Sequence, residues 1–215
     1  MPVKGSVEVR QAIIDACLEM NSSGLNQGTS GNISVREGDG ILITPSGQPY
    51  ARMKPEDIVW LGFDGSREGA LKPSTEFRFH LDILRAKPEM NAVVHAHPTA
   101  CTTLAIMEKG IPPLHYMVAV AGGHDIRCAP YATFGTAELS ELAVAALEDR
   151  AACLLAHHGS IACGNSLDKA MWLAVEVEAL AKQYLGCLPF GEPPLLSVEE
   201  IDRVLEKVKG YGLQK

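Results

Sequence analysis

The sequence predicts an α/β fold: a three-layer α/β/α sandwich around a mixed, largely antiparallel sheet, with one domain spanning residues 1–215. Short apolar segments with strand character recur along the chain. Those in the first half are joined by hairpin turns, whereas those in the second half alternate with amphipathic helices. No repeat, low-complexity stretch or Pro/Gly/Ser linker divides the chain. We therefore expect helices to cover one continuous mixed sheet.

Six apolar segments have the length and composition of strands. The first two flank the turn Glu37–Gly40, whose glycines can adopt positive φ, and therefore form a hairpin. Two others are continuous apolar runs typical of buried strands; one leads to His95 and the other to His157. The last segment is expected to resume the strand before it, beyond Gly159. The expected strands cover residues 33–35, 41–43, 59–63, 92–94, 153–156 and 161–163.

Apolar residues at helical spacing, together with capping and stopping residues, predict six helices. Ser74 and Thr136 are candidate N-caps, and the run Ser197–Glu200 matches a capping box. Pro98 suits the first turn of a helix, because its ring fixes a helical φ. The expected helices cover residues 7–23, 74–85, 98–110, 136–148, 167–185 and 197–209.

Charge and composition exclude several classes of partner. The net charge of −7 argues against nucleic acid, which requires a basic face to displace counterions. No apolar run approaches the roughly 20 residues that span a bilayer, so no membrane partner is expected. The first ten residues lack the apolar core of a secretory signal, and we expect a cytoplasmic protein. Its six cysteines form no CxxC pair and are expected to be reduced thiols.

Two histidine-containing segments are candidate metal ligands. His95 and His97 lie two residues apart at the end of an apolar strand, so both imidazoles can point to one place. A third imidazole from His157 or His158, at the end of another apolar strand, would complete three protein ligands with one open position. That arrangement is typical of catalytic zinc. Spacing alone leaves the choice between His157 and His158 open, and a single HxH pattern also occurs by chance.

A carboxylate and a further histidine lie on the expected helix that follows Ser74. Glu76 and His80 are four residues apart and share a face, so either could add a ligand or a base. The alternative for Glu76 is a favourable interaction with the helix dipole. From spacing alone, His80, His115 and His124 are expected to be hydrogen-bonded or solvated histidines rather than ligands.

Three loops of small residues are candidates for anion binding: residues 28–32, 44–47 and 73–75. Each offers backbone N–H groups and hydroxyls without bulk, and Ser74-Thr75 would lie at a helix N-terminus, where the dipole favours phosphate. Ordinary turns use the same residue types. None of the three matches a P-loop or GxGxxG pattern, so a nucleotide site is not indicated.

Eight segments together resemble the class II aldolase/adducin family and, within it, the L-fuculose-1-phosphate aldolases. They follow one another over nearly the whole chain, so the resemblance is far more specific than the HxH pair. The segments are GLNQGTSGNISVR (24–36), GILITPSGQPY (40–50), PSTEFRFH (73–80), NAVVHAHP (91–98), IPPLHYM (111–117), CAPYATFGT (128–136), AHHGSIAC (156–163) and LEKVKGYGL (205–213).

The resemblance implies one divalent metal ion per subunit, of the Zn2+ type, on His95, His97 and His158. It therefore selects the second histidine of the 157–158 pair. Glu76 resembles the carboxylate that closes the coordination sphere and acts as acid and base when substrate displaces it.

The resemblance also implies a substrate site between subunits of a cyclic homotetramer. Tyr116 resembles a tyrosine contributed by the neighbouring subunit, and Phe134 and Tyr211 resemble residues on the aldehyde side. Where the family pattern has two serines after a proline, this chain has Ser74-Thr75, which leaves the sugar preference open. The implied phosphate-binding residues are Gly31, Asn32, Ser46, Gly47, Ser74 and Thr75.

The implied activity is reversible cleavage of L-fuculose 1-phosphate, or a closely related ketose 1-phosphate, to dihydroxyacetone phosphate and L-lactaldehyde in fucose catabolism. A first alternative is aldol cleavage of 5-deoxyribulose or methylthioribulose 1-phosphate. A second is 4-epimerisation of a pentulose 5-phosphate, or dehydration of a methylthiopentulose phosphate, on the same fold. A third is an adducin-like interaction module without catalysis. That module would be expected to lose the metal ligands, whereas all three histidines and Glu76 are present.

Overall fold

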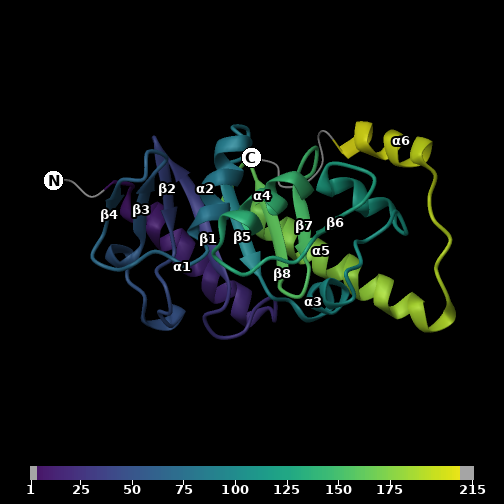
Figure 1. Ribbon diagram of the computed structural model, residues 1–215, viewed down its shortest axis with the longest axis horizontal. Coiled ribbons are helices and arrows are strands. Elements are labelled where there is room, and N and C mark those ends of the chain that lie inside the picture. Colours follow the sequence, from purple (N-terminus) through teal and green to yellow (C-terminus); the bar gives the residue numbers. More distant parts are fainter. Residues whose placement is uncertain (1–3, 209–215) are drawn as a thin grey trace.

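The protein folds around one eight-stranded sheet, and the computed structural model describes residues 4–208 (Figure 1). Its strands are β1 Asn32–Glu37, β2 Gly40–Ile43, β3 Val59–Gly62, β4 Arg67–Glu68, β5 Ala92–Ala96, β6 Arg127–Ala129, β7 Ala152–Leu155 and β8 Gly159–Gly164. They lie in the order β4-β3-β2-β1-β5-β8-β7-β6. Every neighbouring pair is antiparallel except β6 and β7. The predicted mixed, largely antiparallel sheet is confirmed.

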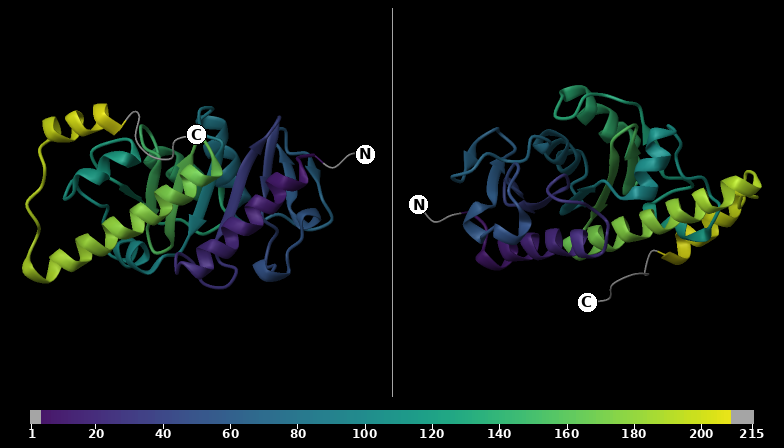
Figure 2. Two further views of the ribbon diagram at one scale, coloured as in Figure 1. Left: turned by 180° about the vertical axis from the view of Figure 1, so that it is seen from behind. Right: turned by 90° about the horizontal axis from the view of Figure 1, so that it is seen from below.

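Helices cover both faces of this sheet. The helices of the described chain are α1 Val7–Ser22, α2 Phe77–Ala86, α3 Thr99–Ile106, α4 Ala137–Ala146, α5 Leu167–Cys187 and α6 Val198–Val208, of which α6 packs against the 3-10 segment Tyr116–Ala121. The buried faces of α1, α3 and α5 share one apolar cluster, and those of α2 and α4 share the other. The right-hand view of Figure 2 shows α1 and α5 following one another along the same face of the sheet. The three-layer α/β/α arrangement predicted from the sequence is therefore confirmed.

Alternation along β5 determines which layer the candidate ligands face. Val94 packs in the cluster with α1, α3 and α5, whereas Val93 packs in the cluster with α2 and α4. Residues two apart in a strand project to the same side, so His95 faces α2, like Val93. The ring of His95 accordingly packs edge-on against Phe79 of α2, with ring centroids 5.3 Å apart. The candidate site thus lies on the α2 side of the sheet, where β5 ends.

The expected start of α2 is wrong. The helix begins at Phe77, with Glu76 in the N-cap position, and Ser74 Oγ instead accepts a hydrogen bond from the backbone N–H of Glu76. The reason is non-local: the backbone N–H of Ser74 donates to Thr44 O, and that of Ser46 donates to Lys72 O. This pairing keeps the segment before Glu76 extended beside the loop that follows β2.

The second half of the sheet also differs from the sequence-based expectation. Residues 161–163 do not continue the strand at 153–156; β8 reverses direction and pairs antiparallel with β7. The chain reverses in the tight turn that contains His157, whose backbone φ is +54°. The two short strands β4 and β6 were not predicted. The helix expected over 98–110 is shorter, since α3 ends at Ile106.

The N-terminus of α3 is held by a buried carboxylate. Glu178 of α5 is 5% exposed and accepts hydrogen bonds from the backbone N–H groups of Ala100 and Cys101, at 3.1 and 3.0 Å. Helix N-termini leave such N–H groups without intrahelical partners. Glu178 therefore fixes the turn in which the chain passes from His97 into α3. Of the helices in the described part of the chain, none combines the length and apolar character needed to span a bilayer.

Candidate active site

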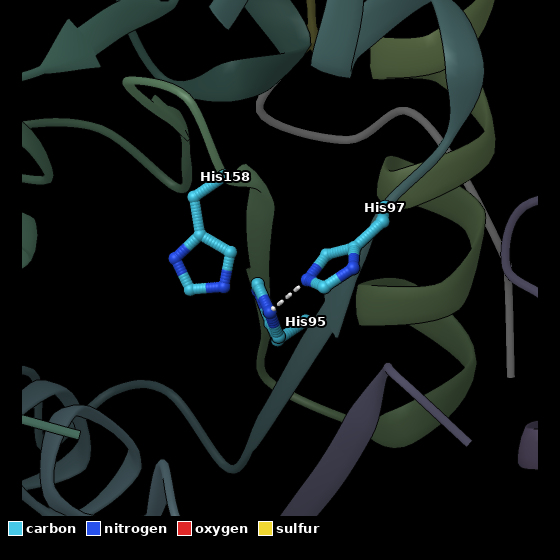
Figure 3. Close-up of side chains that lie close together, drawn as sticks. All are labelled: His95, His97 and His158. Carbon is cyan, nitrogen blue, oxygen red and sulfur yellow. Dashed lines mark hydrogen bonds between the residues drawn. The ribbon is translucent and has the colours of Figure 1, made fainter. Parts of the chain in front are cut away.

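Three histidines meet where β5 ends and where β7 turns into β8 (Figure 3). His95 Nε2 lies 2.9 Å from His97 Nε2, and the candidate ligand atoms of His95, His97 and His158 all lie within 4.8 Å of one another. Glu76 contacts the same cluster, with Oε2 3.3 Å from His95 Nε2 and Oε1 3.1 Å from His158 Nε2. The structure thus brings together the four residues expected to form the metal site.

The backbone of β8 orients His95. Its Nδ1 lies 2.9 Å from the carbonyl oxygen of Ser160, and a carbonyl can only accept, so Nδ1 carries the proton and donates it. The other ring nitrogen, Nε2, then faces the cluster and is the atom available to a metal ion. Metal-bound histidines characteristically donate their other ring N–H in this way.

The β7–β8 turn distinguishes His158 from His157. His157 occupies the left-handed backbone region, and its Nε2 lies 3.2 Å from Glu108 Oε1, outside the histidine cluster. The backbone N–H of His158 donates to Leu155 O, which closes the turn. The His158 imidazole packs against those of His95 and His97, with ring centroids 4.8 and 5.0 Å apart. Spacing alone could not resolve this choice, because it depends on the backbone conformation of one residue.

Two glycines allow neighbouring segments of the site to pack closely together. A Cβ atom on Gly159 would lie 2.6 Å from His97 Cδ2 and 2.5 Å from Ala96 O. A Cβ atom on Gly31 would lie 2.8 Å from His95 O. Such distances are far below ordinary van der Waals contact, so both positions require glycine. Gly159 was not among the residues predicted from the sequence; the only signal was its place directly after His158.

Glu76 is a buried carboxylate whose two oxygens differ in their hydrogen bonding. Oε2 accepts a hydrogen bond of 2.9 Å from Asn32 Nδ2, whereas Oε1 forms no well-oriented hydrogen bond within the described residues and has His158 Nε2 as its contact, at 3.1 Å. Burial alone would raise the pKa of Glu76, but His95 and His158 outweigh burial and bring it well below its ordinary value. The carboxylate is therefore ionised, although it is only 5% exposed.

This donor set fits a divalent metal ion of the zinc type. Burial, followed by the neighbouring His95 and His158, lowers the pKa of His97 to about 3, so its ring is neutral and offers a lone pair. The unpartnered Oε1 of Glu76 faces the same cluster. A tetrahedral ion with Zn–N bonds of about 2.0–2.1 Å requires ligand atoms about 3.3 Å apart, similar to the contacts seen here. Imidazole ligands favour zinc, copper, iron or nickel over magnesium.

A cavity of about 400 Å3 opens beside this cluster, and Glu76, His97 and His158 form part of its wall. The extended pairing of the segments around Pro45 and Pro73 brings two of the small-residue loops side by side. All six residues expected to bind phosphate line the cavity: Gly31, Asn32, Ser46, Gly47, Ser74 and Thr75. Asn32 also has a second task, because its amide contacts Glu76 and His80.

The three aromatic residues expected at the site differ in where they lie. Phe134 lines the cavity and is 62% exposed. Tyr116 lies in the 3-10 segment Tyr116–Ala121, is 51% exposed, and is absent from the cavity wall formed by the described residues. Tyr211 lies outside the described residues. Tyr131, which was not predicted, lines the cavity beside Phe134.

The whole fold has counterparts among known proteins. A sequence profile of the family described as Class II Aldolase and Adducin N-terminal domain matches residues 11–185. The chain therefore belongs to this family, and the prediction of an enzyme of the class II aldolase type, an aldehyde-lyase, is confirmed. Class II aldolases depend on a metal, and the three-histidine cluster can bind one.

Individual relatives match almost the whole chain. It is 55% identical over 206 residues to the 5-methylthioribulose-1-phosphate/5-deoxyribulose-1-phosphate aldolase of Rhodospirillum rubrum, covering 96% of this chain and 93% of the relative. It is 53% identical over 208 residues to the L-fuculose phosphate aldolase of Escherichia coli K12, covering 96% and 97%. A solved L-fuculose 1-phosphate aldolase superimposes with a TM-score of 0.93 at 40% identity, covering 96% of this chain and 98% of that one.

Proposed function

We propose that this protein is a zinc-dependent aldolase that reversibly cleaves L-fuculose 1-phosphate, or a closely related ketose 1-phosphate, to dihydroxyacetone phosphate and L-lactaldehyde. The observation that carries the proposal is the unpartnered Oε1 of Glu76, held beside three histidines in the wall of a cavity lined by small-residue loops. These features combine a base, a metal site and a phosphate cradle. The similarity to L-fuculose phosphate aldolases supports this substrate and a role in fucose catabolism.

The phosphate group would occupy the part of the cavity between the three loops. Gly31, Ser46, Gly47 and Thr75 offer backbone N–H groups and hydroxyls there without bulky side chains. Ser74 lies close to the N-terminus of α2, whose dipole favours an anion. Anchoring the phosphate would place the reacting carbons of the ketone fragment beside the histidine cluster.

Glu76 would act on the carbon next to the ketone. In the direction of synthesis, its ionised carboxylate removes a proton from C3 of dihydroxyacetone phosphate, and the resulting carbon nucleophile attacks the aldehyde. In cleavage, Glu76 returns that proton to C3 after the C3–C4 bond breaks. A divalent ion on His95, His97 and His158 would supply the electron sink for the negative charge on the ketone fragment.

Tyr116 would serve the aldehyde side from a neighbouring subunit. In synthesis its hydroxyl would donate a proton to the aldehyde oxygen, which becomes the C4 hydroxyl, and in cleavage its phenolate oxygen would take that proton back. Its exposure of 51%, and its absence from the cavity wall within the described part of one chain, support this placement. A homotetramer with sites at the subunit boundaries would bring it there. Phe134 and Tyr211 would line the path of the aldehyde.

A second candidate substrate is 5-deoxyribulose or methylthioribulose 1-phosphate. The 55% identity to the Rhodospirillum rubrum aldolase favours it, since that relative is named for these sugars. Both candidates share the phosphate, the ketone fragment and the proposed metal chemistry. They differ only in the aldehyde, which is L-lactaldehyde in one case and acetaldehyde or methylthioacetaldehyde in the other. A 4-epimerase or dehydratase of the same fold would not form these aldehydes.

One experiment tests the activity and separates the candidates. The metal-loaded protein is incubated with dihydroxyacetone phosphate and, separately, with L-lactaldehyde, acetaldehyde and methylthioacetaldehyde, and each product is identified by NMR and mass spectrometry. We expect a new C3–C4 bond with at least one aldehyde and none after chelation of the metal. The largest kcat/KM identifies the substrate. Absence of a condensation product with every aldehyde would refute the proposed function.

A further inference from the structure

A chain of hydrogen bonds runs through the protein interior and ends on Glu76. Ser34 Oγ lies 2.7 Å from His80 Nδ1, His80 Nε2 contacts Asn32 Oδ1, and Asn32 Nδ2 lies 2.9 Å from Glu76 Oε2. Ser34 and His80 are fully buried, and Asn32 and Glu76 are 4% and 5% exposed. Buried polar groups of this kind are costly unless each has a partner. In this series of hydrogen bonds, each of the four side chains has a partner.

The orientation of the Asn32 amide gives these hydrogen bonds one direction of donation. Asn32 donates through Nδ2 to Glu76 Oε2, so its NH2 group faces the carboxylate. The amide oxygen of Asn32 then faces His80 and requires a proton on Nε2. The other ring nitrogen, Nδ1, is left as an acceptor and receives the hydroxyl proton of Ser34. Each donor thus meets an acceptor, and the tautomer of His80 is determined.

The surroundings of His80 keep the ring in that single state. Its ring stacks on that of Phe79, with centroids 4.7 Å apart. Burial, followed by the nearby His95, lowers the pKa of His80 to about 3, so the ring is neutral at physiological pH. A neutral ring has one proton to place, and Ser34 and Asn32 occupy both nitrogens.

We infer that His80 is a positioning residue for the proposed base: its Nε2–H tautomer, set by Ser34, locks the Asn32 amide so that Nδ2 holds Glu76 Oε2. Glu76 Oε1 is then the oxygen that remains for the metal and the substrate. If Nε2 carried no proton, Asn32 would turn its amide and place Oδ1 against the carboxylate, which would displace Glu76. The inference rests on the proposed role of Glu76.

The orientation of Asn32 also affects the phosphate cradle, because Asn32 lies between Glu76 and the loops that form this cradle. It lines the cavity and follows Gly31 directly. A rotated amide would therefore alter both the carboxylate that moves the proton and the wall beside the phosphate. His80 reaches neither: it is fully buried and does not line the cavity, so it acts only through Asn32.

Three variants test the inference. His80→Gln keeps an N–H donor near the position of Nε2, His80→Leu removes the donor at similar volume, and Ser34→Ala removes only the proton that fixes the tautomer. We expect His80→Leu to slow C–H exchange of dihydroxyacetone phosphate and to weaken metal binding by about 10- to 100-fold, as for other outer-shell partners. His80→Gln should restore both to within about 3-fold of the parent enzyme on the same scale. If His80→Leu fails to fold, Ser34→Ala carries the test.

A readout independent of catalysis is the imidazole tautomer in the metal-free protein. Two-bond 1H–15N correlation spectra should show only Nε2–H for His80 in the parent protein and a detectable Nδ1–H fraction in Ser34→Ala. An Nδ1–H ring in the parent protein, or His80→Leu with unchanged exchange and metal affinity, would overturn the inference. An inactive parent enzyme with the expected tautomer and metal effects would instead refute the proposed reaction and leave the positioning of Glu76 intact.

Discussion

The side-chain amide of Asn32 donates a 2.9 Å hydrogen bond to Oε2 of Glu76, a residue 44 positions further along the chain. Asn32 begins β1, and Glu76 precedes the first residue of α2, so the bond ties the sheet to the helix layer above it. It also distinguishes the two carboxylate oxygens: Oε2 accepts the hydrogen bond from Asn32, and Oε1 faces His158 without a well-oriented hydrogen bond. The chemical roles assigned to the site depend on this division, and each can be tested separately.

Replacing Glu76 by Gln should abolish proton transfer while leaving the shape of the site nearly unchanged. We expect C–H exchange of dihydroxyacetone phosphate to fall by about 10²- to 10⁴-fold, the usual contribution of a general acid or base. Deuterium incorporation from D2O measures exchange, and atomic absorption measures retained metal. Glu108→Gln, at an exposed carboxylate that contacts His157, is the matched control. Undiminished exchange in Glu76→Gln would contradict the assignment.

Replacing His158 should remove metal, whereas replacing His157 should not. Only His158 packs against both His95 and His97. We expect His158→Gln to lower metal affinity by more than about 100-fold, beyond the range typical of outer-shell partners. His157→Asn suits the left-handed backbone at φ +54° and should keep the metal. Competition with a coloured chelator measures both affinities, and equal losses would argue against the ligand set.

Tyr116→Phe should separate the two halves of the reaction. Only the aldehyde side requires the hydroxyl, so cleavage should fall by about 10²- to 10⁴-fold while exchange of dihydroxyacetone phosphate continues. Metal content should stay normal. Tyr131→Phe is the control, because Tyr131 lines the cavity of its own chain. Parallel loss of exchange and metal in Tyr116→Phe would show that the tyrosine supports the structure instead.

His80 should make the metal-free protein less stable in acid. Its pKa is about 3 when folded, as a result of burial and then of His95, against 6.5 for the ordinary side chain. Between these values the unfolded chain binds a proton that the folded one does not, so the free energy of unfolding falls as pH drops below about 6.5. The full effect, reached as the pH falls to about 3, is about 5 kcal/mol, since one pKa unit corresponds to about 1.4 kcal/mol.

Urea denaturation of the metal-free protein between pH 7 and pH 4 measures this dependence. The curve for His80→Gln should be shallower than that of the parent protein, because the variant has no ring to protonate. His97 contributes equally to the pH dependence of the free energy of unfolding in both proteins, so its contribution cancels when the two curves are compared. Curves of equal slope would show that the His80 ring is protonated in the folded protein.

Removing Glu178 should loosen the turn that follows His97. Glu178→Ala leaves the buried backbone N–H groups of Ala100 and Cys101 without their acceptor, at a cost of about 1–3 kcal/mol in the free energy of unfolding. Urea denaturation measures it. The control is Lys182→Ala, which removes the exposed partner of the same carboxylate and should cost less than about 1 kcal/mol. If the two variants lowered the free energy of unfolding by similar amounts, the ion pair between Lys182 and Glu178 would account for the stabilisation.

The strand pattern and the pair His95 and His97 could be predicted from the sequence, because both follow from local alternation. Apolar runs identified the central strands, and the two-residue spacing placed both imidazoles on one side. The three-residue strand β6 was missed, since Arg127–Ala129 is too short to show alternation and its parallel partner is distant in sequence. The start of α2 was missed because Ser74 pairs with Thr44 rather than joining the helix.

The interior network could not be predicted, because it depends on which side chains meet across layers. Asn32 and Ser34 are two residues apart in β1 and therefore share a face, which was the one signal available. Nothing local indicated that this face meets His80 on α2. His80 was expected only to be hydrogen-bonded or solvated; the structure shows it fully buried and paired at both nitrogens.

Strand β5 joins the two halves of the sheet, pairing with β1 on one side and β8 on the other. Any opening that separates the hairpin half from the other half must break one of these two ladders, and His95 belongs to both. Loss of the β5–β8 ladder would separate His158 from His95 and His97, and loss of the β1–β5 ladder would move Asn32, which holds Glu76, away from the histidines. A bound metal ion would thus connect the two halves of the sheet. The rate of metal release would measure how often local unfolding separates these halves.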